Sequence, residues 1–287
     1  MTLRLGPREF ADTELVVMAI VNRTPDSFYD RGATYSTEAA LAAVDQAVAD
    51  GADIVDIGGV KAGYGEPVGA AEEIDRVAGF VGLVRDRHPK LVISVDTWRA
   101  EVAREVVPAG ANLLNDTWAG ADPALAEVAA ETGVGLVCSH TGGLAPRTDP
   151  HRTTYADVVA DVIGTVTGLA ERAAGLGVPR GSILVDPTHD FGKNTRHSLE
   201  LTRRLPELVA TGWPVLVAAS NKDFIGETLD LPAGERLEGT LATLAVCAWL
   251  GARVFRVHQV RAARRVLDMV AAIRGTREPA VCRRGLA

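Results

Sequence analysis

The feature that most constrains the fold of this chain is a regular alternation between short apolar runs and longer segments of helical period. The apolar runs are rich in Val, Ile and Leu, and each ends in a polar or glycine turn. Such runs are typical of parallel strands that are buried on both faces. We therefore predict strands at Leu15–Val21, Asp53–Ile57, Leu91–Val95, Asn112–Leu114, Gly135–Cys138, Ser182–Val185, Val215–Ala218 and Arg253–Arg256.

Segments whose apolar residues recur at helical spacing follow many of these runs. The spacing predicts helices at Thr37–Asp50, Ala71–Arg87, Trp98–Val107, Tyr155–Leu176, Glu235–Leu250 and Ala262–Arg274. A glycine often ends a helix that leads into a strand. Such glycines stand at Gly51, Gly110, Gly133, Gly177 and Gly251.

Eight strand–helix units that run in one direction, with no long polar linker, predict an α/β fold, a (β/α)8 TIM barrel, with a single domain over residues 1–287. A doubly wound open sheet is the alternative, although such sheets usually have fewer strands. Hydrophobic residues make up 47% of the chain, which is enough for a large core, whereas aromatic residues make up only 5%. Val, Leu, Ile and Ala must therefore supply most of the packing.

The charge and the cysteines argue against several classes of protein. A formal net charge of -7 argues against nucleic acid as the main partner, although a local group of basic residues can still bind a small anion. None of Cys138, Cys247 and Cys282 lies in a Cys-x-x-Cys pair, which argues against a zinc site or a disulfide framework. The sequence has no apolar run of about 18 residues and no signal-peptide pattern, so we expect a cytoplasmic protein with no membrane partner.

Polar side chains follow most of the predicted strands, at the point where each strand ends. In a barrel the loops after the strands build the active site, so these side chains should converge on one mouth. A single aspartate after a strand is more often a helix N-cap than a catalyst, but the whole set favours a site. Its members are Asn22, Asp96, Asn115, Asp186, Lys222, Arg256 and His258.

The chemistry of this set divides into two halves. A carboxylate such as Asp186 can accept two hydrogen bonds from an N–C–N edge, an amide such as Asn115 can donate and accept, and the Lys222 ammonium can donate to a ring carbonyl or nitrogen. This half suits a flat, nitrogen-rich heterocycle. Arg256 and His258, with Asn22 across the mouth, suit a phosphate-like anion, for which the end of strand eight is a common position.

Residues 22–28 carry the most specific motif of the chain. They read Asn-Arg-Thr-Pro-Asp-Ser-Phe, which resembles the Asn-Val-Thr-Pro-Asp-Ser-Phe signature of the dihydropteroate synthase family. The resemblance covers the chain from Val17 to about Val270. Further stretches similar to that family follow in the family's order: Asp56–Gly59, Ser94–Thr97, Asn115–Asp116, Asp186–Lys193, Lys222–Gly226 and Arg256–His258.

The resemblance implies a transferase of folate biosynthesis that joins 4-aminobenzoate to 6-hydroxymethyl-7,8-dihydropterin pyrophosphate and releases pyrophosphate, with Mg²⁺. By position, Asp96, Asn115, Asp186 and Lys222 match the family's pterin pocket, while Asn22, Arg256 and His258 match its pyrophosphate site, with Asn22 at the metal. The resemblance also implies that the carbon–oxygen bond ionises first. Asp96, Lys222 and Arg256 are then the expected catalytic residues, which stabilise a pterin cation and a leaving anion. A homodimer through helices late in the chain is implied as well.

The departures from the family pattern cluster on the side of the second substrate. Residues 60–65 read Val-Lys-Ala-Gly-Tyr-Gly where the family usually has Glu-Ser-Thr-Arg-Pro-Gly, so the Thr and Arg of that loop are absent. The family's Ser-Arg-Lys is Ser220–Lys222, with asparagine in the middle, and its Asp-Pro-Gly-x-Gly-Phe-Gly-Lys is Asp186–Lys193, with Thr188 and Asp190 at two glycine positions. The usual His-Met after strand five is Ser139-His140. A divergent, second-copy type of the family has this kind of loop.

Three functions remain open on the sequence. The first is a dihydropteroate synthase-type transferase, and the second is a catalytically weak or inactive pterin-binding paralogue that acts on another amine or only binds. The third is a barrel that transfers methyl groups with a cobalamin partner, which would leave the Arg256–His258 pair without a role. We interpret His140 and His189 as solvated loop residues, with a changed acceptor site as the alternative, and we interpret Trp98, Trp118, Trp213 and Trp249 as packing residues.

Overall fold

The computed structural model of the chain describes residues 1–24, 36–61, 63, 66–148 and 154–284. Its central sheet consists of eight parallel strands, hydrogen-bonded in the order β8-β7-β6-β5-β4-β3-β10-β9. An isolated parallel bridge between Val185 and Val215 brings β8 beside β9, so the sheet is a nearly closed barrel. The strands are β3 (Val16–Asn22), β4 (Ile54–Gly58), β5 (Val92–Asp96), β6 (Leu113–Asp116), β7 (Gly135–Ser139), β8 (Ile183–Asp186), β9 (Leu216–Val217) and β10 (Val254–Val257).

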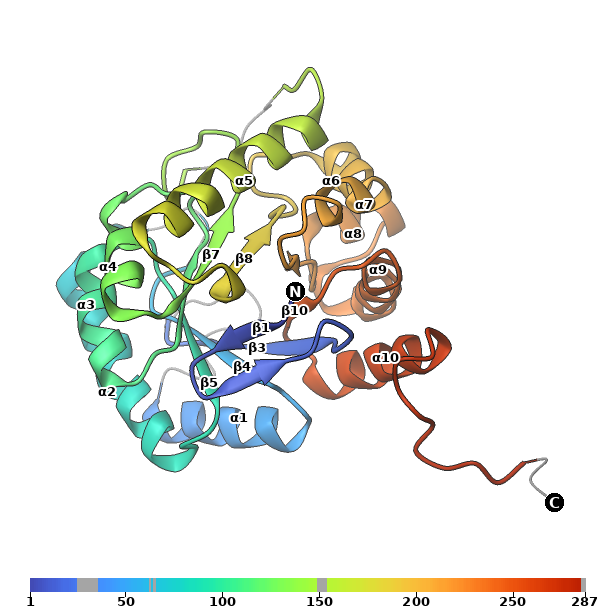
Figure 1. Cartoon of the computed structure of the whole chain (residues 1–287), viewed down its shortest axis with the longest axis horizontal. Coiled ribbons are helices and arrows are strands. Elements are labelled where there is room, and N and C mark those ends of the chain that lie inside the picture. The colour runs from blue at the N-terminus through green and yellow to red at the C-terminus, as the bar shows by residue number, and fades with distance from the viewer. Residues whose placement is uncertain (25–35, 62, 64–65, 149–153, 285–287) are drawn as a thin grey trace.

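The helices surround this sheet, as Figure 1 shows in a view along the barrel. They are α1 (Thr37–Ala49), α2 (Ala70–Arg87), α3 (Ala100–Ala109), α4 (Ala124–Thr132), α5 (Val158–Leu176), α6 (Thr195–Arg203), α7 (Leu205–Val209), α8 (Asp223–Leu229), α9 (Leu237–Trp249) and α10 (Val260–Ile273). The prediction of a (β/α)8 TIM barrel is confirmed, and the predicted strands agree with the observed ones to within about two residues. None of the helices in the described ranges has the length and apolarity needed to span a bilayer.

The glycines predicted to end helices do so in a backbone conformation that favours glycine. Gly110 follows α3 with a φ of 124°, and its amide N–H donates to the carbonyls of Val106 and Val107. A side chain at this φ would be strained. The other four predicted positions also have positive φ.

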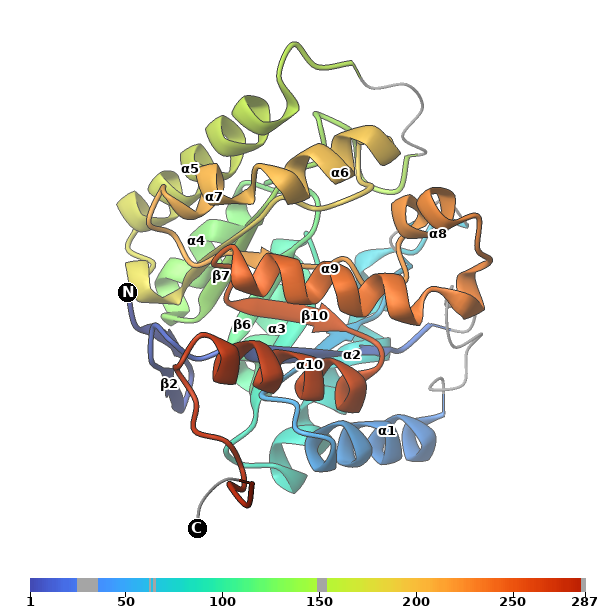
Figure 2. The ribbon, with the colours of Figure 1, turned by 90° about the vertical axis from the view of Figure 1, so that its right-hand side faces the viewer.

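A short hairpin, β1 (Leu3–Leu5) and β2 (Arg8–Phe10), was not predicted from the sequence. Three residues of this hairpin, Leu3, Leu5 and Phe10, are almost fully buried and belong to the same cluster as the side chains inside the barrel. The hairpin therefore closes the amino-terminal end of the barrel. Figure 2 shows it at the opposite end of the molecule from α8.

The interior of the barrel changes from apolar to polar along the strands. Ile54, Val92, Leu113 and Val254 belong to the apolar interior cluster. Because side chains of one strand alternate between faces, the residues two positions later point the same way. These are Asp56, Ser94, Asn115 and Arg256, which form a polar layer on top of the apolar one, nearer the carboxyl ends.

Candidate functional site

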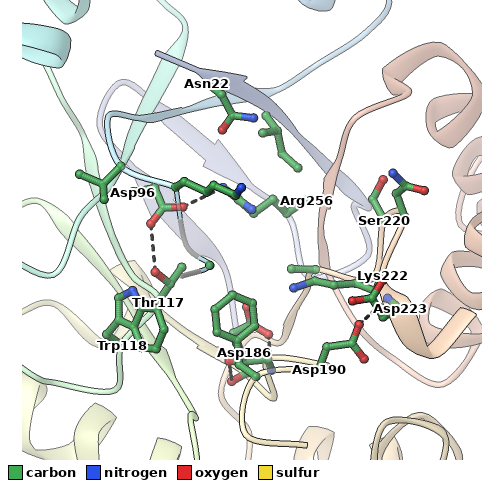
Figure 3. Close-up of a pocket in the computed structure, with 18 of the residues that line it drawn as sticks. Asn22, Asp96, Thr117, Trp118, Asp186, Asp190, Ser220, Lys222, Asp223 and Arg256 are labelled. Atoms are coloured by element: carbon green, nitrogen blue, oxygen red, sulfur yellow. Dashed lines mark hydrogen bonds and ion pairs between the residues drawn. The ribbon is translucent and has the colours of Figure 1, made fainter. Parts of the chain in front are cut away.

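A cavity of about 350 Å³ opens at the carboxyl ends of the strands, above the polar layer (Figure 3). Six of the seven predicted site residues line it: Asn22, Asp96, Asp186, Lys222, Arg256 and His258. Its wall also contains residues that were not predicted as site residues, among them Thr117, Trp118, Asp190, Phe191, Ser220 and Asp223. The strand ends thus bring together chain segments that are more than two hundred residues apart in sequence.

Asp56 anchors the floor of this cavity and was missed as a site residue. Its side chain is fully buried, and it accepts hydrogen bonds from the Ser94 hydroxyl at 2.5 Å, the Asn115 amide at 3.0 Å and Arg256 Nε at 2.6 Å. A buried charge of this kind is stable only when it is paired and hydrogen-bonded. The alternation of side chains along β4 could have revealed it. Asp56 lies two residues after the inward-facing Ile54, so it also points into the barrel.

Asp96 holds the other side of the Arg256 guanidinium. Arg256 Nη2 donates to Asp96 Oδ2 at 2.9 Å, and the Thr117 hydroxyl donates to Asp96 Oδ1 at 3.0 Å, as the dashed lines in Figure 3 show. Burial raises the pKa of the Asp96 carboxyl to about 7, although the charge of Arg256 works against this rise. The two carboxylates therefore fix the position of one guanidinium in the middle of the cavity.

Asn115, predicted to read the edge of a heterocycle, lies just beneath the cavity wall. Its side chain is buried, and its Nδ2 donates to Asp56. Its Oδ1 has no hydrogen-bond partner among the described residues. An unpartnered buried carbonyl oxygen is costly, and a ligand donor can offset that cost.

Asp186 and Lys222 face the same cavity from β8 and from the start of α8. Burial raises the pKa of the Asp186 carboxyl to about 6, although a hydrogen bond from the Thr188 amide, at 2.7 Å, and the charge of Lys222 lower it. Burial lowers the pKa of the Lys222 ammonium, whose Nζ lies 4.2 Å from the centre of the Phe191 ring. A cation over an aromatic face at this distance is stabilised by the ring.

His258 and Asn22 occupy the rim on the side of β10 and β3. His258 Nδ1 lies 3.0 Å from the Ser220 hydroxyl, and burial, together with the charges of Arg256 and Lys222, lowers the pKa of this imidazole to about 3. It is therefore neutral at pH 7 and offers hydrogen bonds rather than charge. Asn22 lies beside Gly58, where an added Cβ would be 3.6 Å from Asn22 Oδ1 and 4.0 Å from Asp96 Oδ2.

A buried lysine holds the loop that carries Asp186 in place. Lys193 Nζ donates to the backbone carbonyls of His140, Thr188 and Phe191 at 3.0, 3.0 and 2.8 Å. Burial lowers its pKa to about 7. The loop after β8 and the end of β7 are thereby tied to one side chain, which fixes the direction of Phe191 in the cavity wall.

The interpretation of His140 and His189 as solvated loop residues is wrong. Both are almost completely buried and neither is part of the cavity wall. His140 Nε2 lies 2.7 Å from Asp161, and His189 stacks on Phe224 and lies 3.1 Å from the Thr202 hydroxyl. Burial lowers the pKa of His140 to about 4 and that of His189 to about 3, so both are neutral packing residues.

The four tryptophans, all predicted to be packing residues, differ in how far they are buried. Trp118 and Trp213 are buried as expected, and Trp98 is half-buried. Trp118 is also part of the cavity wall. Trp249 contradicts the prediction of a packing residue, because 60% of its surface is exposed at the end of α9. Cys138 and Cys247 are buried core residues.

The segments that depart from the family pattern are described only in part. Val60, Lys61 and Gly63 line the cavity. Residues 62, 64 and 65 of that loop lie outside the described residues, as do residues 25–28 of the signature. Of the altered residues in the other two motifs, Thr188, Asp190 and Asn221 all line the cavity.

A magnesium ion fits this site only if the protein and the substrate coordinate it together. Within the described residues there is no group of three or more His, Cys, Asp or Glu side chains placed to hold a metal. Mg²⁺ commonly takes only one or two protein oxygens together with water and phosphate. Asn22 Oδ1 and Asp96 Oδ2 both lie near Gly58, and Asp96 Oδ2 also accepts a hydrogen bond from Arg256, so Asn22 Oδ1 is the oxygen that would contact an ion arriving with a phosphorylated ligand.

Comparisons with known proteins show to which family the chain is similar. The sequence profile of the family described as "Pterin binding enzyme" matches residues 18–258. A Mycobacterium leprae relative named inactive dihydropteroate synthase 2 is 62% identical, with both chains covered completely. The dihydropteroate synthase of Bacillus subtilis is 38% identical over 90% of this chain and 88% of its own. A crystal structure of the Yersinia pestis dihydropteroate synthase with a sulfonamide drug complex has a TM-score of 0.90 at 33% identity, covering 96% of this chain and 100% of that one.

Proposed function

The chain belongs to the pterin-binding enzyme family, as a dihydropteroate synthase-type protein of the divergent second-copy kind, and from that premise we propose that its cavity binds a pterin pyrophosphate but condenses it with 4-aminobenzoate only slowly. The observation that carries the proposal is the contrast within one cavity. Asp96, Asp186 and Lys222, which match the family's pterin pocket, all line it, whereas Val60, Lys61 and Gly63 line it where the family has its second-substrate loop.

The pterin half uses groups that are already fixed before a ligand arrives. Asp186 keeps one oxygen on the Thr188 amide, and its carboxylate can accept from the N–C–N edge of the heterocycle. Lys222 donates from the other side, and the unpartnered Oδ1 of Asn115 can accept a further ring N–H if the ligand reaches below the wall. A preorganised, buried set of this kind binds a flat heterocycle without first having to order its own side chains.

The anion half consists of Arg256, His258 and Asn22. The Arg256 guanidinium uses Nε and Nη2 on two carboxylates, and the neutral His258 ring can donate one hydrogen bond to a phosphate oxygen. Mg²⁺ held by Asn22 and the pyrophosphate would neutralise part of the charge that develops on the leaving group. These groups stabilise the departing anion, while the Asp96 carboxylate stabilises the positive charge that remains on the pterin.

The catalytic role of the protein side chains is then mainly electrostatic. When the bond between the pterin methylene carbon and the oxygen breaks, its electron pair leaves with the pyrophosphate, and the amine nitrogen attacks the resulting cation and afterwards loses a proton. No strong general base is needed for this order of events. Orientation of the amine is needed, however, and this is where the altered loop at Val60, Lys61 and Gly63 lies.

The test separates pterin binding from condensation. Calorimetry with a 6-hydroxymethyl pterin is expected to give an affinity similar to that of an active family member. Pyrophosphate release from the pterin pyrophosphate with Mg²⁺ and 4-aminobenzoate is expected to be at least about tenfold slower, which corresponds to a loss of about 1.4 kcal/mol of transition-state stabilisation. Absence of pterin binding would refute the proposal, and turnover at the rate of an active family member would refute its second half.

We further propose that the protein forms a homodimer through α9 and α10, which lie side by side on one face of the molecule in Figure 2. The apolar side chains of Val246 and Trp249 on α9, and of Met269 and Ile273 on α10, are exposed by 48%, 60%, 61% and 61%. Exposed apolar groups on neighbouring helices are typical of an interface between subunits. The variant Trp249→Glu should elute as a monomer in size-exclusion chromatography with light scattering, whereas a monomeric wild type would contradict the proposal.

A further inference from the structure

Two carboxylates line the cavity beside Lys222, as Figure 3 shows. Asp190 comes from the loop after β8, and Asp223 is the first residue of α8. Asp190 Oδ2 accepts hydrogen bonds from the backbone N–H groups of Asp223 at 2.6 Å and Phe224 at 3.3 Å. The Ser198 hydroxyl donates to Asp190 Oδ1 at 3.2 Å. The carboxylate of Asp190 is therefore fixed against the first turn of α8.

Asp190 stands at a backbone position that disfavours most side chains. Its φ is 71°, in the left-handed region, where the family motif quoted above has glycine. Aspartate tolerates this region better than most residues, but glycine adopts it without strain. The carboxylate is held here despite that strain, and its hydrogen bonds to α8 are what offset the cost.

The electrostatic consequence concerns any ligand group that reaches this wall. Two backbone N–H groups at the start of α8, which would otherwise attract an anion, are already bonded to Asp190. Asp223 lies at the rim, where the charge of Arg236, 2.7 Å away, compensates its own. A ligand carboxylate placed beside Asp190 is repelled by the Asp190 charge and finds these N–H groups already taken, whereas a carboxamide of the same shape is not repelled.

The rest of the wall near this point favours an aromatic ring. Phe191 and Trp118 pack edge to face with ring centres 5.5 Å apart, and Leu144 lies in the same cavity wall. Aromatic pairs of this geometry offer an apolar surface to a third ring. An uncharged aromatic amine therefore matches both the shape and the charge of this side.

The geometry points to Asp190, assisted by Asp223, as a specificity-determining residue that excludes acceptor amines carrying a carboxylate, so that the second substrate is an uncharged aromatic amine. This inference rests on the proposed function, since it names the acceptor of the same pterin site. It also accounts for slow condensation with 4-aminobenzoate, because that amine carries the excluded group.

The experiment compares two ligands that differ only in this group. Calorimetry is performed with dihydropteroate and with its carboxamide, both of which carry the pterin half and need no turnover to bind. The carboxamide is expected to bind to the wild type at least about tenfold more tightly, as expected for like charges at short distance. In parallel, pyrophosphate release with 4-aminobenzamide should exceed release with 4-aminobenzoate.

The variant Asp190→Gly is expected to remove most of the preference for the carboxamide, and Asp223→Asn a smaller part of it. Glycine fits the φ of position 190, so the variant should fold. Asp230→Gly is the matched control, since Asp230 also has a positive φ, of 55°, but is exposed at the far end of α8. This control should retain the full preference.

The outcomes separate this inference from the proposed function. If plain 6-hydroxymethyl pterin fails to bind, the pterin site is refuted and the acceptor specificity with it. If the pterin binds but the two dihydropteroate ligands bind equally, only the acceptor specificity is refuted. A preference for the carboxamide that persists in Asp190→Gly would likewise overturn the role of Asp190.

Discussion

The two walls of the cavity are built in different ways. The strand wall consists of side chains from β4, β5, β8 and β10, and its charged groups Asp56, Asp96 and Arg256 bond to one another in the barrel. The side chains of Asp96 and Arg256 are only 14% and 16% exposed. The loop wall consists of the segments after β4 and β8 and of the start of α8, where the Asp223 side chain is 68% exposed.

This difference explains which wall keeps the family pattern. A residue of the strand wall shares its partners with several others, so that a single change leaves a buried charge unpaired and is costly. An exposed residue of the loop wall, such as Asp223, can change at little cost to the fold, because solvent satisfies the groups that it leaves behind. The departures from the family motifs, such as Lys61 after β4 and Asp190 after β8, lie in loops rather than in strands.

The largest expected effect tests whether the strand wall is a single network. Asp56→Ala removes the shared acceptor of Ser94, Asn115 and Arg256 and should lower the free energy of unfolding by about 3–5 kcal/mol. Urea denaturation measures this loss. The loop-wall variant Asp223→Ala should cost less than about 1 kcal/mol, because the Asp223 side chain is 68% exposed and Arg236 still donates to the carbonyls of Asn221 and Leu231. Similar losses for both variants would remove the distinction between the walls.

The second prediction asks whether the strand wall binds the pterin. Asp186→Ala should weaken the binding of a pterin analogue by about 2–4 kcal/mol, the loss expected for a buried charge-assisted hydrogen bond. Asp116→Ala is the control, because Asp116 is also buried at a strand end and accepts from the backbone of Trp118 and Gly120, yet is not part of the cavity wall. Calorimetry that shows unchanged affinity in Asp186→Ala would exclude this residue from the site.

The third prediction separates the pterin half of the cavity from its anion half. Arg256→Ala and His258→Ala should weaken the pyrophosphorylated pterin at least about tenfold more than the plain hydroxymethyl pterin, because their donors face the phosphate. Lys222→Ala should weaken both ligands to a similar extent, since its ammonium faces the ring. Competition binding with the two ligands measures the ratio. Equal weakening in the Arg256 variant would mean that this residue supports the fold only.

Much of the strand wall could be predicted from the sequence. The apolar runs end where the strands end, so the polar residue at the end of each run marks the mouth of the barrel. Asp96 and Asp186 directly follow their runs and Arg256 is the last residue of its own, and all three line one cavity. Asp56 was missed because it lies inside an apolar run, where only the period of two along β4 distinguishes it. The helices α4, α6, α7 and α8 were missed because they have only five to nine residues each and little periodicity.

The packing of the loops around the cavity could not be predicted to the same extent. The sequence shows that His140 and His189 are polar, but whether a loop side chain turns into the packing or toward solvent depends on neighbours such as Asp161 and Phe224, which lie far away in the chain. The hydrogen bond that Asp190 accepts from the first turn of α8 could not be predicted either, since it joins residues that are more than thirty positions apart. Long-range contacts of single side chains leave no local pattern.

The smallest expected effect concerns the loop after β4. It tests whether this loop alone limits the rate of condensation. Placing Ser-Thr-Arg-Pro at positions 61–64 restores the family residues, and the pterin affinity should stay the same because the pterin contacts lie on other strands. One regained, partly exposed charge contact contributes about 1 kcal/mol, so that the rate of pyrophosphate release with 4-aminobenzoate should rise only about fivefold. The charge of Asp190 remains opposed to the aminobenzoate carboxylate in this variant. Combining the four-residue replacement with Asp190→Gly should therefore raise the rate more than either change alone. A replacement that restores the full family rate by itself would show that the loop, and not the start of α8, governs the choice of amine.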